Sequence, residues 1–161
     1  QYSMKRSIQK RKREMKIDRF DGKYAFLSNF YSSPIAPFND GIVYPTVEHA
    51  FQAYKTTDIN KRKEIAAQPT PGKAKHLGRH VKIRDDWQEI RISVMYTALK
   101  EKFKDLELQA KLLSTGNAEL IEGNTWSDNF WGDCHCPKCR GIKGENNLGK
   151  LLMKIREDYK S

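Results

Sequence analysis

The chain has 161 residues, of which 38% are hydrophobic, so it holds enough apolar material for one sizeable core and too much for a disordered chain. This length nearly excludes a two-domain enzyme with a full dinucleotide-binding domain. No apolar run approaches the roughly 20 residues of a membrane span, and the N-terminus lacks the apolar core of a signal peptide. We therefore expect a cytoplasmic, intracellular protein without a membrane partner.

The formal net charge of +10 is unevenly spread along the chain. Residues 1–16 carry +6 and residues 61–84 carry +7, while the remainder is slightly acidic. A charge of this size indicates an anionic partner. We expect residues 1–16 to be a basic, flexible N-terminal arm, with a nucleic-acid contact as the alternative, and residues 17–161 to form one folded domain.

The first folded elements are a hairpin and a helix. The apolar segments 34–38 and 41–44 flank a turn signal, and the prolines place one strand at an edge. Thr46 then predicts the N-cap of a helix that runs to about Lys55 with an apolar stripe at i, i+3, i+4 and i+7. An acid, an amide and an amine lie in a row beside that stripe, where they could line the wall of a cleft. They are Glu48, Gln52 and Lys55.

Helices dominate the rest of the chain. Residues 61–84 predict a helix, a break at prolines and glycines, and a second short helix, and residues 86–103 and 105–113 predict two more. A short strand over 118–121 and a long loop over 122–147 precede a final amphipathic helix. The expected fold class is α+β: a compact, mainly helical single domain with a few short strands.

The three cysteines are crowded together, which is not the pattern of a secreted disulfide framework. Cys134, Cys136 and Cys139 could share a zinc ion, with His135 or a distant histidine as a further ligand. A second C-x-x-C is missing, so a structural zinc and a loop with free thiols are equal alternatives. Catalytic zinc is disfavoured because three thiolates make an electron-rich site.

Common nucleotide-hydrolase and protease mechanisms lose support, because no P-loop, G-x-G-x-x-G, H-E-x-x-H or G-x-S-x-G motif is present.

Loop aromatics beside polar residues can stack on a base, although each alone is most simply a core residue. Glu48 lies near a helix N-terminus, where a negative charge interacts favourably with the helix dipole, and Asp128 could be an Asx-turn residue. The alternative for both carboxylates is general acid–base chemistry. The loop aromatics and their polar neighbours are Phe26, Phe30, Tyr31, Trp126, Phe130, Trp131, Asn29, Asp128 and Asn129.

Seven motifs occur in a fixed order between about Phe20 and Tyr159. They are Leu27-Ser28-Asn29-Phe30, Pro45-Thr46-x-Glu48-His49-x-x-Gln52-x-x-Lys55, Gly78-Arg79, Asp86-Trp87, Lys102-Phe103, Asp128-x-x-Trp131-Gly132 and Asn147-Leu148-Gly149-x-x-Leu152-Met153-x-x-Arg156. Together they resemble the NADAR (YbiA-like) family. The resemblance implies a helix-rich single domain with a few strands.

The resemblance also implies an N-glycosidase that acts at ribose C1 and requires no cofactor for hydrolysis. The first expectation is removal of ADP-ribose from ADP-ribosylated guanine in DNA or nucleotides, with a cognate ADP-ribosyltransferase toxin system as the partner. One alternative is an N-glycosidase of phosphoribosyl-amino-pyrimidine riboflavin intermediates. Another is a non-catalytic ADP-ribose or nucleic-acid binding module. The oligomeric state is left open.

Site residues are carried over from the family motifs. Either Glu48 or Asp128 steers water onto C1, or Lys55 attacks C1 of the opened ribose to form a Schiff base. The second route needs a largely neutral lysine, which the charge of Glu48 opposes. Arg79 suits a phosphate group. The expected catalytic residues are Glu48, Lys55 and Asp128, and the expected substrate-binding residues are Asn29, Phe30, His49, Gln52, Arg79, Trp87, Trp131, Asn147 and Gly149.

Overall fold

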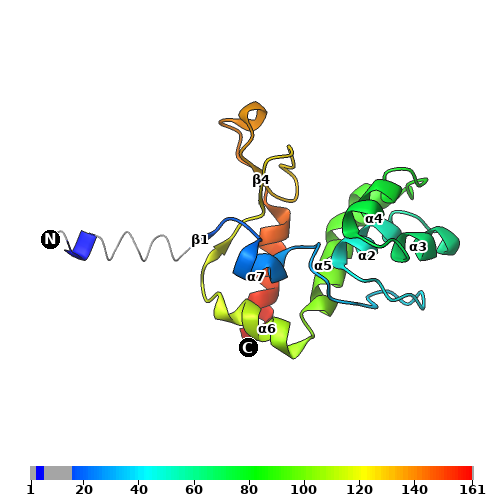
Figure 1. The fold of residues 1–161 in the computed structure, drawn as a ribbon, viewed down its shortest axis with the longest axis horizontal. Helices are drawn as coiled ribbons and strands as arrows, with labels where there is room; N and C mark the ends of the chain where they lie inside the picture. The colour runs from blue at the N-terminus through cyan, green and yellow to red at the C-terminus, as the bar shows by residue number, and fades with distance from the viewer. Residues whose placement is uncertain (1–2, 6–15, 161) are drawn as a thin grey trace. The chain divides into compact units, whose positions relative to one another are not determined.

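The computed structural model describes residues 3–5 and 16–160. Most of the expected arm lies outside these residues, and its last residue, Lys16, belongs to the first strand. Within the described part of the chain, helices predominate and the strands are two residues long, so the expected mainly helical α+β fold is confirmed (Figure 1). None of the described helices is long and apolar enough to cross a bilayer.

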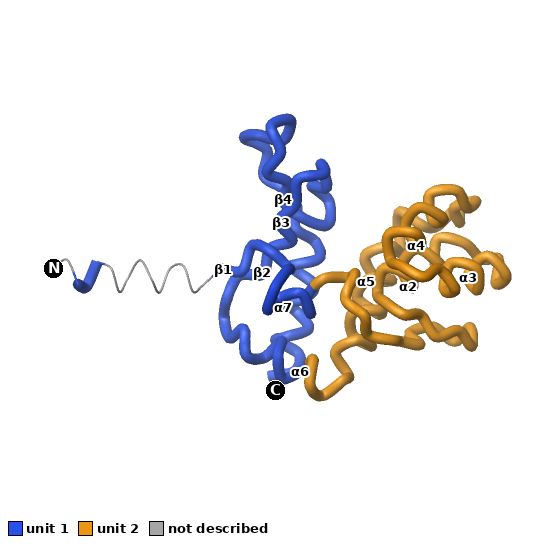
Figure 2. Tube along the Cα trace, viewed as in Figure 1, with its two compact units in different colours: residues 1–27, 109–161 blue, residues 28–108 orange. Residues whose placement is uncertain are grey.

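The chain divides into two units (Figure 2). Unit 1 comprises Gln1–Leu27 and Gln109–Ser161, and unit 2 comprises Ser28–Leu108. The chain passes from unit 2 into unit 1 within helix α6, Leu106–Ser114.

Unit 2 is built around one central helix. Its helices are α2 (Val47–Tyr54), α3 (Ile59–Ala66), α4 (Pro71–Gly78) and α5 (Trp87–Lys102). Helix α2 packs against the other three, and seven of its eight residues are buried. The sequence predicted only one buried stripe on this helix. This prediction underestimated how much of α2 is buried. Periodicity reports one apolar face and cannot reveal that neighbouring helices also cover the polar positions.

The ends of α2 agree with the sequence prediction. The Thr46 side chain accepts a hydrogen bond from the His49 N–H at 3.2 Å, and Lys55 is the C-cap. The expected helix, break and helix of residues 61–84 are realised as α3 and α4, and α5 follows as expected.

The expected hairpin over residues 34–44 is reduced to a single antiparallel bridge between Ile35 and Tyr44. Side-chain interactions, rather than further backbone hydrogen bonds, hold this segment in place. The Tyr44 hydroxyl donates to the Asp40 carboxylate at 2.7 Å, and the Arg62 guanidinium lies 3.4 Å from the same carboxylate. This buried network joins the turn to α3.

Unit 1 joins short strands to a long helix. Strand β1 (Lys16–Ile17) pairs in parallel with β2 (Glu119–Leu120), and β3 (Gly123–Asn124) pairs in parallel with β4 (Asp133–Cys134). Helix α7, Asn147–Lys160, packs against β2. The unit also contains the 3-10 helices η1 (Gly22–Leu27) and η2 (Pro137–Cys139).

The expectation of one continuous loop over residues 122–147 is corrected, because β3, β4 and η2 lie within it. Strands of two residues are too short to show a period-2 pattern, so sequence periodicity could not find them. The strand expected over 118–121 and the final helix are confirmed as β2 and α7.

Gly149 lets α7 approach β2. A Cβ atom at this position would overlap the Leu120 carbonyl and the Asn146 side chain. Gly149→Ala should therefore destabilise the fold by roughly 1–3 kcal/mol through overpacking, although alanine is the better helix former. Chemical denaturation followed by circular dichroism measures the change.

The matched control is Gly72→Ala on α4. A Cβ there would meet only the Thr70 hydroxyl, at 4.0 Å, so we expect stability equal to or above that of the wild type. If Gly149→Ala is as stable as Gly72→Ala, the close approach of α7 to β2 is contradicted.

Candidate functional site

The row of polar residues on α2 is present and largely buried. Glu48 is 7% exposed and Gln52 is 4% exposed. One helical turn separates them, and Gln52 Nε2 donates to Glu48 Oε1 at 2.8 Å. Lys55 follows at the C-cap of the helix and is half-buried. A buried carboxylate is thus held in one orientation by an amide, with an amine at the end of the same helix.

Gly78 makes room for this pair. A Cβ atom at Gly78 would overlap the Gln52 side-chain amide, so α4 crosses α2 with no space for a larger residue. The glycine of the Gly78-Arg79 motif is therefore explained by the close packing of α4 on α2. Arg79 was predicted from the sequence as a site residue, whereas this packing function of Gly78 was not predicted. The signal was the glycine itself, near the end of a helix where no turn requires it.

Asn29 lies at the start of α2. Its backbone oxygen accepts a hydrogen bond from the Glu48 N–H at 3.1 Å, and its Nδ2 points at the Met95 sulfur 3.5 Å away. Two amide oxygens, Asn29 Oδ1 and Gln52 Oε1, are buried without a hydrogen-bond partner in the described part of the chain. An unpaired buried acceptor costs about 1–3 kcal/mol. Gln52 Oε1 is packed against Gly78, so Asn29 Oδ1 is the acceptor of this pair that a ligand's N–H or O–H group could satisfy.

The pKa of Lys55 is lowered. Burial is the largest cause, the negative charge of Glu48 opposes it, and the positive charges of Lys75 and Arg79 lower the pKa further. Burial and the two neighbouring cations therefore outweigh the charge of Glu48, and the net effect on the pKa of Lys55 is downward. Lys75 and Arg79 thus place positive charge close to Lys55.

His49 is used inside the fold. Its side chain is 1% exposed, with Nδ1 2.8 Å from the Thr46 hydroxyl and Nε2 2.9 Å from the Gln68 carbonyl oxygen. A carbonyl can only accept, so Nε2 carries the proton. Burial lowers the pKa of His49 against the opposing effect of the Gln68 hydrogen bond. The ring fixes the start of α2 and has both nitrogens occupied.

The other expected residues of unit 2 differ in exposure. The Trp87 ring is buried 5.0 Å from the Phe51 ring, where it packs α5 onto α2. Phe30 is 47% exposed, and Arg79 is exposed at the C-cap of α4. Phe30 and Arg79 are therefore accessible to a ligand, whereas Trp87 is a packing residue of the core.

The buried position of Lys102 was not predicted from the sequence. This residue ends α5 with only 1% exposure, and its Nζ donates to the Ser28 carbonyl at 2.8 Å. Lysine is almost never fully buried unless it is paired. The Lys102-Phe103 motif was the available signal. The bond ties α5 to the segment that carries Asn29 and Phe30.

Four of the expected catalytic and substrate-binding residues lie in unit 1. The Asp128 carboxylate accepts hydrogen bonds from the N–H groups of Phe130 (3.1 Å) and Trp131 (2.9 Å), which is the Asx-turn alternative. The Asn147 side chain donates to the Phe130 carbonyl at 2.9 Å. Gly149, as described above, packs α7 onto β2. These residues organise the loop before α7.

Asn124 clamps the same loop and was not predicted. Its Nδ2 donates to the Asp128 carbonyl at 2.7 Å, and its Oδ1 accepts from the Asp128 N–H at 3.1 Å. Asn124 is buried on β3, and its side-chain amide thus bonds both the N–H and the carbonyl group of the same residue, Asp128. A lone asparagine in a polar loop gives no sequence signal for this function.

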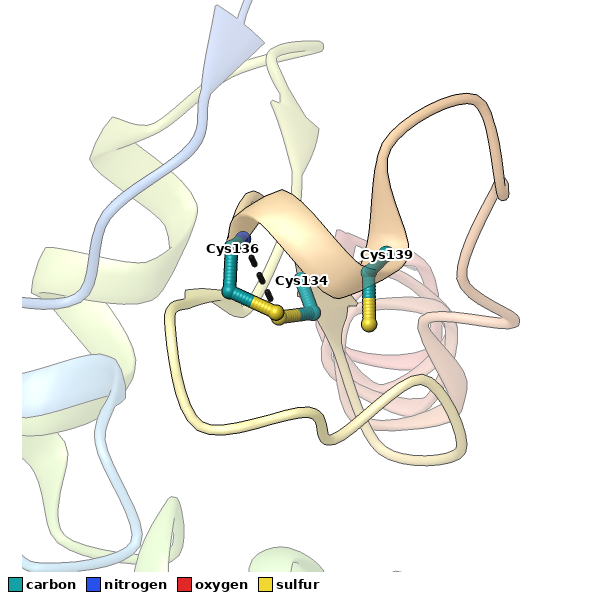
Figure 3. Close-up of side chains that lie close together, drawn as sticks. All are labelled: Cys134, Cys136 and Cys139. Carbon is teal, nitrogen blue, oxygen red and sulfur yellow. Dashed lines mark hydrogen bonds between the residues drawn. The ribbon is translucent and has the colours of Figure 1, made fainter.

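The three cysteines lie together in unit 1 (Figure 3). The Sγ atoms of Cys134, Cys136 and Cys139 are all within 4.8 Å of one another, so the group could hold a metal ion. Hydrogen bonds with Cys134 and then Ser127 lower the pKa of Cys136 to about 6, and the hydrogen bond with Cys136 raises the pKa of Cys139. The expected metal ligands are therefore brought together.

Comparison with known proteins gives consistent matches. The family model of the NADAR domain matches residues 17–160. N-glycosidase YbiA of Escherichia coli strain K12 is 41% identical over 137 residues, which are 83% of this chain and 81% of that protein. A riboflavin biosynthesis protein of Vibrio vulnificus is 35% identical over 141 residues, which are 86% of this chain and 36% of that protein.

A solved structure agrees with these matches. The NMR structure of the E. coli protein YbiA has a TM-score of 0.74 to this chain at 38% identity, and the match covers 91% of this chain and 86% of that chain. The resemblance read from the seven motifs is confirmed, and the model match extends over nearly all of residues 17–161. The chain belongs to the NADAR domain family.

Proposed function

We propose that this chain is an N-glycosidase that hydrolyses the N-glycosidic bond at ribose C1. The observation that carries the proposal is the buried Glu48 carboxylate, held by Gln52 and followed on the same helix by an amine of lowered pKa, Lys55. Cleavage at a sugar C1 passes through an oxocarbenium-like centre, which a fixed carboxylate stabilises. The E. coli relative that is named an N-glycosidase supports the same reaction class.

The proposed substrate is ADP-ribose attached to guanine in DNA or nucleotides. A diphosphate needs cations, and the charges of Lys75 and Arg79 act on Lys55 beside the carboxylate. The stretch 61–84 carries a charge of +7, and its exposed basic residues add a surface for a nucleic-acid backbone; they are Lys61, Lys63, Lys73, Arg79 and Lys82. In this proposal a cognate ADP-ribosyltransferase toxin makes the modified base that the enzyme clears.

Two routes suit these residues, and neither needs a cofactor. In the first, Glu48 accepts a proton from water as the water oxygen attacks C1, and the base leaves with the bonding electron pair and takes up a proton. In the second, the ribose ring opens, the neutral Lys55 amine adds to C1, and the base leaves with the bonding electron pair and takes up a proton. Water then hydrolyses the resulting Schiff base and releases the lysine. The Asp128 carboxylate, which caps a turn in unit 1, is the second candidate for steering water in the first route.

The second candidate function is cleavage of phosphoribosyl-amino-pyrimidine intermediates of riboflavin synthesis. The observation that favours it is the match to the Vibrio protein, which is named for riboflavin biosynthesis. Release of ribose 5-phosphate from such an intermediate, with no release of ADP-ribose from modified guanine, would select it. Tight binding of ADP-ribose without turnover, unchanged in Glu48→Gln, would instead select the binding-module alternative.

Glu48→Gln should abolish most of the activity. The substitution keeps the size of the side chain but removes the charge, so we expect a loss of about 10²–10⁴-fold in kcat on ADP-ribosylated guanosine. Chromatographic separation of ADP-ribose from the freed base measures it. Glu64→Gln, at an exposed carboxylate on α3, is the control and should match the wild type. A Glu48→Gln enzyme with wild-type turnover would contradict the proposal.

The Schiff-base route makes a covalent prediction. Borohydride added during turnover should trap an adduct on wild-type protein, seen by intact mass and mapped to Lys55, and Lys55→Gln should form none. Because only the neutral amine attacks, trapping should fall as pH drops through the lowered pKa of Lys55. Lys61→Gln, an exposed lysine on α3, should trap normally. Turnover without any adduct would favour direct attack by water.

The basic stretch should matter more for DNA than the arm does. Replacing Lys73, Lys75 and Lys82 with glutamine should weaken cleavage of DNA substrates and flatten its salt dependence, by up to about 0.9 in log–log slope per lost phosphate contact. Kinetics over a salt series measure this, with Lys150→Gln on α7 as the control. If deletion of residues 1–15 has the larger effect, the nucleic-acid contact belongs to the arm.

A further inference from the structure

The cysteine side chains converge because of the backbone that carries them. Cys134 ends β4 in extended conformation and Cys136 is also extended, so successive side chains alternate and these two point to the same side. The turn of η2 then brings Cys139 back, with its N–H donating to the Cys136 carbonyl at 3.0 Å. Figure 3 shows the three side chains reaching one small region.

The spacing of the sulfur atoms fits a tetrahedral metal ion. The three Sγ atoms lie within 4.8 Å of one another. Zinc–sulfur bonds of about 2.3 Å in tetrahedral geometry require sulfur atoms about 3.8 Å apart. Small side-chain rotations therefore complete the site, and the clustered thiolates select a soft or borderline ion.

Backbone donors already favour a thiolate at the first of these positions. The Cys134 sulfur accepts hydrogen bonds from the N–H groups of Ser127 (3.2 Å) and Cys136 (3.3 Å). Two donors aimed at one sulfur stabilise its negative form and orient it, as outer-shell groups do around metal ligands.

We propose that Cys134, Cys136 and Cys139 bind one zinc ion as three thiolates, with solvent as the fourth ligand, and that this ion fixes the loop carrying Asp128. His135 is not part of the group of three sulfur atoms, and its Nε2 lies 3.7 Å from the Asp133 carboxylate. Among the residues that the structure describes, no fourth cysteine, histidine or carboxylate joins the group. Beside the sulfurs, residues 133–137 and 139–143 line a hollow of about 630 Å³ that admits solvent.

The charges around the site agree with a structural ion. Three thiolates and Zn²⁺ carry a net charge of −1, and Arg140 and Lys143 line the same hollow. The excess of thiolate charge makes the ion a poor Lewis acid toward its solvent ligand, so it holds the chain in place and takes no part in bond cleavage.

The loop that the ion would hold begins at Ser127. This residue has φ +66, a left-handed conformation that costs a non-glycine residue about 1–2 kcal/mol. Its N–H donates to the Cys134 sulfur, and its hydroxyl lies 3.6 Å from the Cys136 sulfur. The next residue, Asp128, caps the turn to Trp131. Fixing the sulfurs therefore fixes the backbone on which Asp128 and Trp131 are displayed.

Metal analysis of the full chain tests the proposal. Protein kept reduced, stripped with chelator, reloaded with zinc chloride and desalted should retain one equivalent of zinc by mass spectrometry of the metal. Cys134→Ser should lose it, and His135→Ala should keep it. Retention of less than a tenth of an equivalent by the reduced wild type would overturn the site. Loss of zinc in His135→Ala would overturn the solvent-completed coordination.

A second measurement needs no variant, in case Cys134→Ser fails to fold. Cobalt(II) added to stripped wild type should give the thiolate-to-cobalt charge-transfer and intense d–d bands of a tetrahedral sulfur site, and stoichiometric zinc should abolish them. Hydrogen exchange over residues 124–136 should slow when zinc is added. Octahedral cobalt spectra, or exchange that is unchanged by zinc, would overturn the proposal.

Discussion

The burial of α2 on all sides is the constraint on which unit 2 depends. Three helices cover it, so its polar side chains leave water together with its apolar ones. Burying a polar group costs free energy unless it is hydrogen-bonded, and most of the polar groups on α2 have specific partners. Gln52 binds Glu48, and His49 joins Thr46 to the Gln68 carbonyl. The helix that forms the core of unit 2 is therefore also the helix that fixes the candidate site.

Burial also sets the chemistry of the site. Removing Lys55 from water favours its neutral form, and Lys75 and Arg79 add to the effect, while Glu48 only partly offsets it. The same two cations are available to a diphosphate. One arrangement thus lowers the pKa of an amine, holds a carboxylate on the same helix and brings two cations close to that amine. Gly78 is part of this arrangement, because only a residue without a side chain lets α4 lie against Gln52.

Much of the fold could be predicted because caps and breakers leave strong local signals. Thr46, the prolines near 69–71 and the apolar periodicity near the C-terminus placed helices close to where they lie. The two-residue strands and the bridge between Ile35 and Tyr44 could not be predicted, because so short a pairing has no period of its own. The full burial of α2 also could not be read from its sequence, since it depends on three neighbours.

The candidate site was predicted unevenly for physical reasons. The row of Glu48, Gln52 and Lys55 follows from helical spacing, so it could be found once the helix was placed. The inward position of Lys102, the clamp made by Asn124 and the space left by Gly78 depend on tertiary contacts that no local pattern encodes. The sequence spacing of the cysteines predicted that they lie close together. The backbone turn of η2 brings the Cys139 sulfur to the other two.

The central claim is that the Glu48 carboxylate acts at ribose C1. A crystal structure of Glu48→Gln with intact ADP-ribosylated guanosine bound tests it most directly, because the slow variant preserves the substrate. The account predicts that the residue 48 amide lies within contact of C1, at about 3–4 Å directly or through one ordered water, with the diphosphate near Lys75 and Arg79. A substrate whose C1 lies beyond the reach of both residue 48 and a water bound to it would contradict the account.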